Sequence, residues 1–560
     1  MHSRESSPRN GNAGLMLSTS VPPPATGRPG QFRREHALYL ATLLAFGFVI
    51  LTRLVDPLRV NYDVAAAISI ARLLLHGATP YVDYINLNPP LIHYLHVVPA
   101  WIAERLSVNP IITFSWLILV MSGWTVFAVH RVSRALEDRP TGRLVSAVVI
   151  LATALLSVKL TVFDAFGQRE HIFILLYLPY FLLRWLRLHP HRFVDRRLEI
   201  GIGVAAGIGL CLKPHFLLIE ALVEAFLGLQ LRSLRKLASP ELLAVALVGA
   251  AYAVHFAFLP EEARAGMREV LGWLDSGGYK AYGDHSLLEI ITSDLKTLGL
   301  ALATFVLVRD PRGKLGSLLQ LCAVLTLASL LEAGLQARNF FYHGIPNWTG
   351  TYLIVLLVIF GYGAEVRIRG PQANGSSIGR LLSQATSLLV YGLLFLSFLG
   401  WSNIIGPADL AILTPPGPDA ITRAIAENSP PGSSVLIIST GTGLFRSATQ
   451  ADRKVASRFF PDFPIAFSLV EVQDGESLYH NRQAARALLE SHLSGIEDRI
   501  REERPELIVI DGAPTCSGCP RGLNLALLLR EIGFSQRAIL PAYTQVGEYD
   551  GHQLYRRSLP

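Results

Sequence analysis

Charged residues are scarce in this sequence. They make up 17% of the 560 residues, whereas hydrophobic residues make up 51%, and the mean hydropathy is +0.38. Soluble globular domains carry about 25% charged residues, so the composition excludes a water-soluble protein and indicates a chain that crosses a membrane several times. The net charge of +7 comes from Lys and Arg in short loops between apolar runs. Because these residues form no single patch, nucleic-acid binding is excluded.

Cysteine is scarce as well, with four residues in the chain. Cys211 and Cys322 lie in apolar stretches and are expected to be core thiols. Cys516 and Cys519 form a Cys-Ser-Gly-Cys turn in a segment expected to face an oxidising periplasm, which favours a local disulfide. A redox pair and a metal site are the alternatives there. A zinc site would need further ligands nearby, and none is evident in the sequence.

An apolar core is missing from residues 1–35, which are rich in Ser, Pro, Gly and Arg and are predicted to be a disordered cytoplasmic tail. The apolar run after them is too long for a cleaved signal and has no cleavage pattern, so it is expected to stay as a membrane anchor. Eleven segments have the length and composition of a membrane span. They are 37–55, 110–130, 143–159, 171–187, 199–212, 215–231, 241–259, 288–308, 315–333, 346–364 and 380–400.

The placement of basic residues orients these spans. With the N-terminus inside, every loop predicted to be cytoplasmic is basic, as around Arg184, Arg232 and Arg312. Polar clusters gather in the loops on the other side of the membrane, which predicts one external active site. Residues 36–400 are therefore predicted to form a polytopic α-helical membrane domain, with an external loop at 56–109.

The composition changes to that of a soluble domain after Trp401. Residues 401–560 are predicted to form a small α/β domain on the periplasmic side. Gly441-Thr442-Gly443 lacks a full phosphate-loop pattern and is interpreted as a plain strand-to-helix turn. The main predicted strands are 433–440 and 506–511. The main predicted helices are 481–500 and 523–532.

The external loop at 56–109 is too polar to cross a bilayer and too apolar for an ordinary solvated loop, so it is expected to lie on the membrane surface. Residues 64–76 place apolar side chains on one helical face, which is the pattern of an interfacial helix. Pro89 and Pro90 are expected to begin a second short helix. Asp63 lies at the N-terminal edge of the first helix, where a simple N-cap is the alternative to a functional role.

This loop resembles the first external loop of the GT-C glycosyltransferases, in particular the branch of the protein O-mannosyltransferases and the lipid A aminoarabinose transferases. The resemblance implies a multi-pass enzyme that uses a polyprenyl-phosphate sugar, with Asp63 as the catalytic base. Relatives often carry Lys beside the Pro-Pro pair, near the lipid phosphate, whereas this chain has Asn88. That branch is mostly metal-independent and no Asp-x-Asp motif is present, so no metal or other cofactor is expected. The matching residues are Asp63, Gly77, Pro80, Tyr81, Asp83, Pro89, Pro90 and Leu91.

A second external cluster runs from Gln168 through Arg169 and Glu170 to His171. If a helix begins at Gly167, its first turn offers free N–H groups, and the guanidinium of Arg169 offers a planar donor, both suited to a phosphate oxygen. A structural ion pair between Arg169 and Glu170 is the alternative.

Two later clusters supply further candidates. Lys213 interrupts a long apolar region, either because it lines a cavity or because it lies in a hairpin between two spans. Arg338 is the first choice for holding the lipid phosphate, since a guanidinium forms strong charge-assisted hydrogen bonds with phosphate oxygens. Tyr342 and His343 follow it closely, as the resemblance also implies.

These residues predict an inverting displacement at a bacterial inner membrane. Asp63 accepts the proton of an acceptor hydroxyl as it attacks the anomeric carbon, while Arg338, Arg169 and Lys213 stabilise the leaving polyprenyl phosphate. The acceptor is a glycan, a lipid or a protein. The alternatives are a transporter, which should show internal repeats that this sequence lacks, and a lipid-linked glycan ligase or polymerase. The remaining candidates for substrate binding are Tyr81, Asp83, Asn86, Asn88, Gln168, Glu170, His171, Tyr342 and His343.

Overall fold

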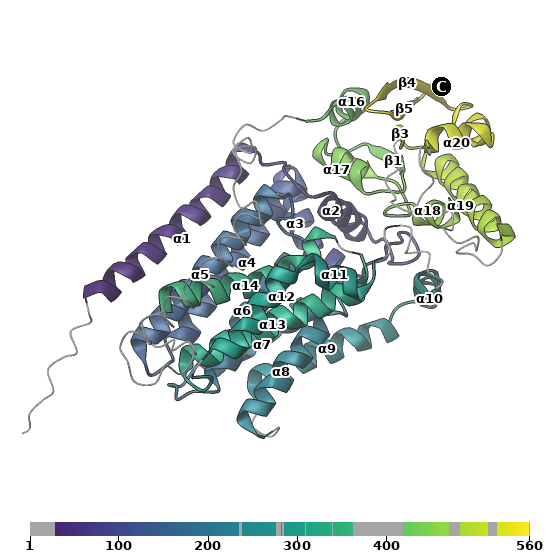
Figure 1. Cartoon of the computed structure of the whole chain (residues 1–560). Coiled ribbons are helices and arrows are strands. Elements are labelled where there is room, and N and C mark those ends of the chain that lie inside the picture. The colour runs from purple at the N-terminus through teal and green to yellow at the C-terminus, as the bar shows by residue number, and fades with distance from the viewer. Residues whose placement is uncertain are drawn as a thin grey trace, which may run out of the picture.

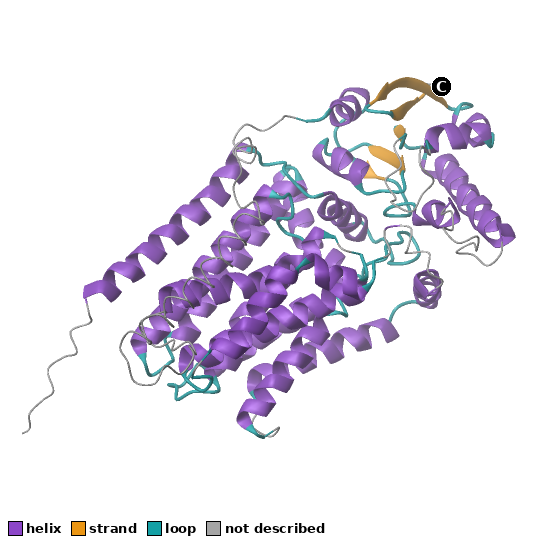
Figure 2. Cartoon of the chain, in the orientation of Figure 1, coloured by secondary structure: helices purple, strands orange, loops and turns teal. Residues whose placement is uncertain are grey.

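The computed structural model consists of a bundle of long helices and a small α/β unit that lies at one end of the bundle (Figures 1 and 2). The five strands found among the described residues all belong to the C-terminal α/β unit. The described residues are 29–233, 238–275, 282, 285–308, 310–338, 340–361, 418–469, 482–512 and 524–558.

Ten of the eleven predicted apolar segments coincide with helices of the bundle. The segment at 288–308 is divided between two helices, and the segment at 380–400 lies outside the described residues. The helices are α1 (Pro29–Val55), α4 (Pro110–Ser133), α5 (Arg139–Val162), α6 (Arg169–Leu186), α7 (Arg196–Cys211), α8 (Phe216–Leu231), α9 (Pro240–Ala257), α11 (Leu287–Ser293), α12 (Leu295–Leu307), α13 (Lys314–Gln336) and α14 (Ile345–Gly361), with the short η3 (Phe341–Gly344) before the last.

The bundle is that of a polytopic membrane protein. Within the described residues, six helices are long and apolar enough to cross a membrane, and the pair α11–α12, bent by 79°, gives a seventh if it is one span. Helices α7 and α8 have 16 residues each, fewer than the roughly 20 that cross a bilayer. The boundary predicted for the disordered tail, at residue 35, is too late, because helix α1 already begins at Pro29. Residues 1–28 lie outside the described part.

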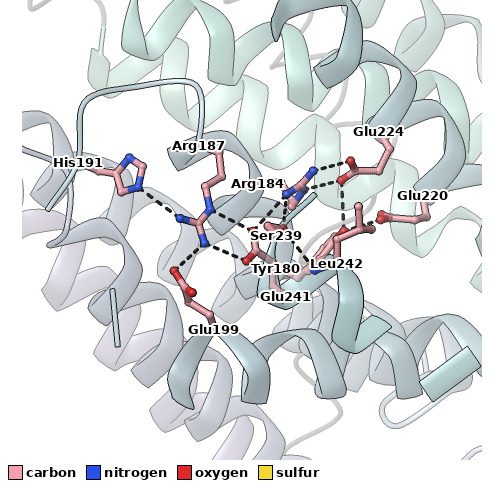
Figure 3. Close-up of polar contacts among 10 residues, drawn as sticks. All are labelled: Tyr180, Arg184, Arg187, His191, Glu199, Glu220, Glu224, Ser239, Glu241 and Leu242. Carbon is pink, nitrogen blue, oxygen red and sulfur yellow. Dashed lines mark hydrogen bonds and ion pairs between the residues drawn. The ribbon is translucent and has the colours of Figure 1, made fainter. Parts of the chain in front are cut away.

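Buried ion pairs join four helices at one end of the bundle (Figure 3). The guanidinium of Arg184, on α6, donates two hydrogen bonds of 2.6 Å to the carboxylate of Glu224 on α8 and contacts Glu241 on α9 at 3.2 Å. Arg187 bridges Glu241 to Glu199 on α7, at 2.9 and 2.6 Å. Because charges in an apolar environment are costly unless paired, this network fixes the register of α6 to α9.

The external loop folds as two helices, as predicted. They are α2 (Tyr62–Leu75) and α3 (Leu91–Leu106), and Pro90 stands at the N-cap position of the second. Helix α2 does not simply lie on a membrane surface. Its residue Ile68 packs into the core of the bundle, whereas Ile70 packs into the core of the α/β unit. The expectation of a surface helix is therefore wrong for α2, which is buried between the two parts of the molecule.

The α/β unit contains a five-stranded sheet of order β2-β1-β3-β5-β4. Its first three strands are parallel, and β5 and β4 are added antiparallel. The apolar runs predicted as strands form β1 and β3 at the centre of the sheet, where all the residues of β3 are buried. Its elements are α16 (Ala420–Asn428), β1 (Ser434–Ile438), α17 (Gly443–Gln450), β2 (Lys454–Val455), α18 (Phe463–Leu469), α19 (Arg482–Glu503), β3 (Leu507–Ile510), α20 (Leu525–Glu531), η5 (Ser535–Ile539), β4 (Tyr543–Tyr549) and β5 (His552–Arg557).

The described residues include two of the four cysteines. Cys322 is buried in α13, as expected of a core thiol, whereas Cys211 at the end of α7 is partly exposed. Cys516 and Cys519 lie outside the described residues, so their disulfide stays a prediction.

Helix α17 docks the α/β unit onto α2. The hydroxyls of Ser69 and Thr449 lie 3.0 Å apart, and the guanidinium of Arg72 lies 3.1 Å from the carboxylate of Asp452. The amide of Asn109, at the start of α4, donates to the carbonyl of Thr449 at 2.9 Å. Since apolar residues of α2 and α17 also share one core, the α/β unit has a defined position on the bundle.

We expect Arg184→Met to destabilise the bundle by about 3–5 kcal/mol, because it leaves the largely buried carboxylate of Glu224 without its cation and leaves Glu241 with Arg187 alone. Adding Glu224→Gln should recover part of the loss, since one unpaired charge is removed. The measurement is the thermal midpoint in detergent, with Arg197→Gln, an exposed arginine at the start of α7, as the matched control. Equal midpoints for Arg184→Met and the control would contradict a stabilising network.

Candidate functional site

Asp63 occupies the first turn of α2 but does not cap it. The side chain of Asn61 is the N-cap, and its Oδ1 accepts a hydrogen bond from the backbone N–H of Asp63 at 2.9 Å. The interpretation of Asp63 as a simple N-cap is therefore wrong. Its carboxylate is left to make other contacts.

Two side chains from distant parts of the sequence hold the Asp63 carboxylate. Gln168 donates through Nε2 to Oδ2 at 3.3 Å, and the hydroxyl of Thr442 donates to Oδ1 at 3.2 Å. Gln168 Nε2 also donates to Asn61 Oδ1 at 2.6 Å, so Asn61 and Gln168 lie in one hydrogen-bonded group. Each carboxylate oxygen of Asp63 thus has a donor, one from the bundle and one from the α/β unit.

Burial raises the pKa of Asp63 above its usual value, because a charged carboxylate loses hydration there. The positive charge of Arg169 opposes this rise, as do hydrogen bonds from Gln168, Thr442 and Tyr342. A carboxyl group whose pKa is raised accepts a proton more readily than an ordinary aspartate, which is the property of a general base.

A cavity of about 320 Å³ opens beside Asp63. Five of the predicted site residues line it together: Asp63, Asn86, Asn88, Arg169 and Tyr342. Other parts of the wall come from residues that the sequence did not predict, including Phe340, Phe460 and the turn Gly441, Thr442 and Gly443.

The Gly441-Thr442-Gly443 turn is the part of the site that sequence reasoning missed. It follows β1 at the carboxyl end of a parallel strand and leads into α17, the place where open α/β sheets commonly bind ligands. That signal was available in the sequence, but nothing in it pairs this turn with an aspartate 379 positions earlier.

Arg169 brings the positive charge that the resemblance assigned to another position. Its Nη1 donates to Oδ1 of Asn88, the residue that stands where relatives often carry Lys beside the Pro-Pro pair. The departure at Asn88 therefore does not remove the cation from this place, because a guanidinium from the start of α6 is held there instead.

The turn before α6 depends on Gly167. Its φ is +82°, and a Cβ at this position would lie 2.5 Å from the ring of Phe114. The backbone N–H of Gly167 donates to Nδ1 of His171 at 3.1 Å. His171 is fully buried and does not line the cavity of Asp63, so it supports the turn that presents Gln168 and Arg169.

Glu170 and Lys213 form a buried ion pair of their own. The ammonium of Lys213 lies 2.8 Å from Oε1 of Glu170, whose side chain is fully buried. Glu170 therefore contacts the α7–α8 connection, whereas Arg169 donates to Asn88, and a pair between Arg169 and Glu170 stays an alternative. Neither Glu170 nor Lys213 lines the cavity.

Four other predicted residues lie away from this cavity. Tyr81 has a φ of +63° and packs beside α10 (Glu261–Asp275), and Asp83 accepts a hydrogen bond from the backbone N–H of Thr79 at 2.7 Å, so both support a turn. Arg338 contacts the carbonyl of Ala337 and is not among the lining residues. His343 lines a second cavity.

The second cavity has a volume of about 350 Å³ and shares Phe340 with the first. It lies among α5, α13 and α14 and the junction of α11 and α12, and most of its wall is apolar. Its cation is Lys159, whose ammonium lies 3.6 Å from the ring centroid of Trp348.

Among the residues that the structure describes, no group of three or more His, Cys, Asp and Glu is arranged to hold a metal ion. The expectation of a metal-independent reaction stays a prediction.

Comparison with solved structures identifies the fold. The chain is similar to ArnT from Cupriavidus metallidurans in a crystal structure with bound undecaprenyl phosphate, with a TM-score of 0.52 and 12% identity over 93% of this chain and 98% of that chain. The apo crystal structure of the same ArnT matches with a TM-score of 0.51 and 11% identity over 92% and 97%. No protein-family model and no curated protein sequence matches the chain.

The donor from Thr442 is expected to lower the pKa of Asp63, because it hydrogen-bonds to the charged form. Thr442→Val should therefore raise this pKa, and Thr442→Ser should leave it unchanged. Dicyclohexylcarbodiimide reacts with protonated carboxyl groups, so mass spectrometry of labelling against pH measures it. The labelling midpoint of Asp63 should move to higher pH in Thr442→Val, while the exposed Asp83 provides the internal control. An unchanged midpoint would show that Thr442 does not lower the pKa of Asp63.

Proposed function

We propose that this chain, which has the GT-C fold, is a membrane glycosyltransferase that transfers a sugar from a polyprenyl-phosphate donor to an acceptor hydroxyl, with inversion at the anomeric carbon. The observation that carries the proposal is the pairing of a base and a cation in one cavity. Asp63 supplies a carboxylate with a raised pKa, and Arg169 supplies a guanidinium in the wall of the same cavity.

In the proposed reaction, the acceptor hydroxyl donates its proton to Asp63 while its oxygen attacks the anomeric carbon. The bond between that carbon and the phosphate oxygen breaks, and both of its electrons leave with the polyprenyl phosphate. Gln168 and Thr442 hold the carboxylate in a fixed orientation. Arg169 stabilises the charge on the leaving phosphate through charge-assisted hydrogen bonds.

The second cavity supports a lipid-linked donor. With the sugar beside Asp63 and the phosphate beside Arg169, the isoprenoid chain would pass Phe340 into the apolar space next to α13 and α14. ArnT, which shares this fold, was crystallised with bound undecaprenyl phosphate. A polyprenyl phosphate is thus the ligand class that this pair of cavities suits best.

Charge distribution supports a periplasmic site in a bacterial inner membrane. Helix α6 begins at Arg169 beside the cavity and is 18 residues long, which separates its two ends by about 27 Å. The buried Arg184 and the partly exposed Arg187 lie at the far end, and exposed arginines follow in the connecting loop and at the start of α7, at Arg192, Arg196 and Arg197. Since basic loops remain cytoplasmic, this distribution supports a periplasmic position for the cavity and the α/β unit.

Asp63→Asn should lower the rate of sugar transfer by about 10²–10⁴-fold, since the base is lost, without preventing donor binding. The assay uses purified protein with a panel of radiolabelled polyprenyl-phosphate sugars and counts both transfer and hydrolysis to free sugar. Asp83→Asn, an exposed aspartate in the same loop, is the matched control and should behave as wild type. Wild-type rates in Asp63→Asn would remove Asp63 from the mechanism.

The structure also ranks the two arginines proposed to hold the phosphate. Arg169 lines the cavity and Arg338 does not, so Arg169→Gln should weaken donor binding and slow transfer by about tenfold or more. Arg338→Gln should have a much smaller effect. Donor KM and kcat for the two variants provide the measurement, and a larger loss in Arg338→Gln would reverse the assignment.

A further inference from the structure

A small cavity of about 20 Å³ adjoins the cavity of Asp63. The two cavities share Asp63, Asn88 and Arg169 in their walls, so the same side chains border both. The small cavity also extends to Ala67 on α2 and to His96 on α3. It therefore lies directly beside the proposed base, in the space that α2, α3 and the start of α6 surround.

His96 borders the small cavity and carries a nitrogen without a partner. The residue is 1% exposed, and its ring stacks on Phe114 with the ring centroids 4.6 Å apart. Its Nδ1 lies 2.7 Å from the carbonyl oxygen of Ile92. A carbonyl oxygen only accepts, so Nδ1 carries the ring proton and donates it there. Among the described residues, no group forms a hydrogen bond with Nε2, which is left as a buried acceptor.

His96 is neutral at physiological pH. Burial lowers its pKa to about 4, because a charged imidazolium would lose its hydration, and the hydrogen bond to Ile92 opposes this effect only in part. A histidine with a lowered pKa is uncharged above that pH, so Nε2 keeps its lone pair. Since a buried acceptor without a partner is costly, this nitrogen favours a hydrogen-bond donor in the small cavity.

A water molecule is the ligand that fits the small cavity. About 10–15 Å³ of such space holds one water, which then needs two to four polar partners. The wall supplies acceptors in His96 Nε2 and the Asp63 carboxylate, and donors in Gln168 and Arg169. The carboxylate accepts about four hydrogen bonds in all, so the donors from Gln168 and Thr442 leave room for another. A phosphate group or a sugar ring is larger than this space.

We propose that one water molecule binds in the small cavity and donates one hydrogen bond to His96 Nε2 and the other to the Asp63 carboxylate. His96 is then a positioning residue, which acts on the reaction through this water and not by contact with a substrate. The water adds a further donor to the carboxylate and fixes its orientation. The role of Asp63 as a base rests on the function proposed above, whereas the link itself is measured without any reaction.

Charged and titratable groups reach Asp63 from several elements. Arg169 on α6 and Tyr342 on η3 favour the charged carboxylate. Tyr62, the preceding residue of α2, has its pKa raised to about 12 by burial and by the charge of Asp63. Because the pKa of His96 is about 4, neither Tyr62 nor His96 titrates near neutral pH. A change in the protonation midpoint of Asp63 there reports the hydrogen bonds that its carboxylate accepts.

The test measures the protonation of Asp63 in the full-length protein by dicyclohexylcarbodiimide labelling against pH, with the exposed Asp83 as the internal standard. His96→Phe keeps an aromatic ring against Phe114 but offers no acceptor to the water. Since the carboxylate then loses a hydrogen bond to its charged form, the labelling midpoint should move to higher pH by about one pH unit. The ascending limb of the pH profile of transfer kcat/KM should move with it, which a loss of packing alone would not cause.

Two further variants separate the water from the ring. Ala67→Val fills the small cavity and leaves His96 unchanged, so the midpoint should again move to higher pH. His96→Gln provides an amide oxygen to which the water can donate, and should keep the midpoint close to that of wild type. His93→Phe is the matched control and should leave the midpoint unchanged, because His93 lies on the same helix, is 2% exposed and does not line the small cavity.

The outcomes separate this proposal from the reaction itself. An unchanged midpoint in either His96→Phe or Ala67→Val would overturn the link, as would an equal movement in His93→Phe or in His96→Gln. The thermal midpoint in detergent verifies folding, and if one of the first two variants does not fold, the other decides. A midpoint that moves in His96→Phe, together with wild-type sugar transfer in Asp63→Asn, would retain the link and reject the proposed base.

Discussion

The environment of the Asp63 carboxylate depends on the contact between α2 and the α/β unit. Without α17 and its preceding turn, this carboxylate would lose the hydrogen bond from Thr442 and the cavity would lose a wall. The same contact buries the carboxylate and so raises its pKa. Burial and orientation of the proposed base therefore have one cause, which is the docking fixed by Ser69, Arg72 and Asn109.

Helix α6 connects two polar centres with different roles. At its start, Gln168 and Arg169 extend toward a cavity and contact side chains that other elements present there. At its end, Arg184 and Arg187 are saturated by carboxylates from three neighbouring helices. The saturated end holds the bundle together. The start of the helix borders a cavity that a ligand can enter, which distinguishes a candidate site from a structural network.

The sequence predicted the helices and strands better than the tertiary contacts between them. Apolar periodicity located the bundle helices and the central strands, and the resemblance predicted the GT-C fold that comparison with ArnT confirms. Of the residues that local patterns singled out, Asn86, Asn88 and Arg169 line the cavity of Asp63, and Glu170, Lys213 and Arg338 do not. Local patterns cannot separate these two groups, because a charged residue near a membrane boundary is equally compatible with a buried ion pair and with a site. Thr442 was missed since its contact with Asp63 is a tertiary one, which no local pattern encodes.

The separation of Asp63 and Thr442 by 379 positions has a consequence for biosynthesis. At translation rates of about 5–20 residues per second, Thr442 leaves the ribosome roughly 20–75 s after Asp63. During this interval the membrane helices can insert and α2 can form, but the carboxylate still lacks its second donor and its cover. A nascent or truncated chain that ends before the α/β unit would therefore be embedded in the membrane with the cavity beside Asp63 incomplete.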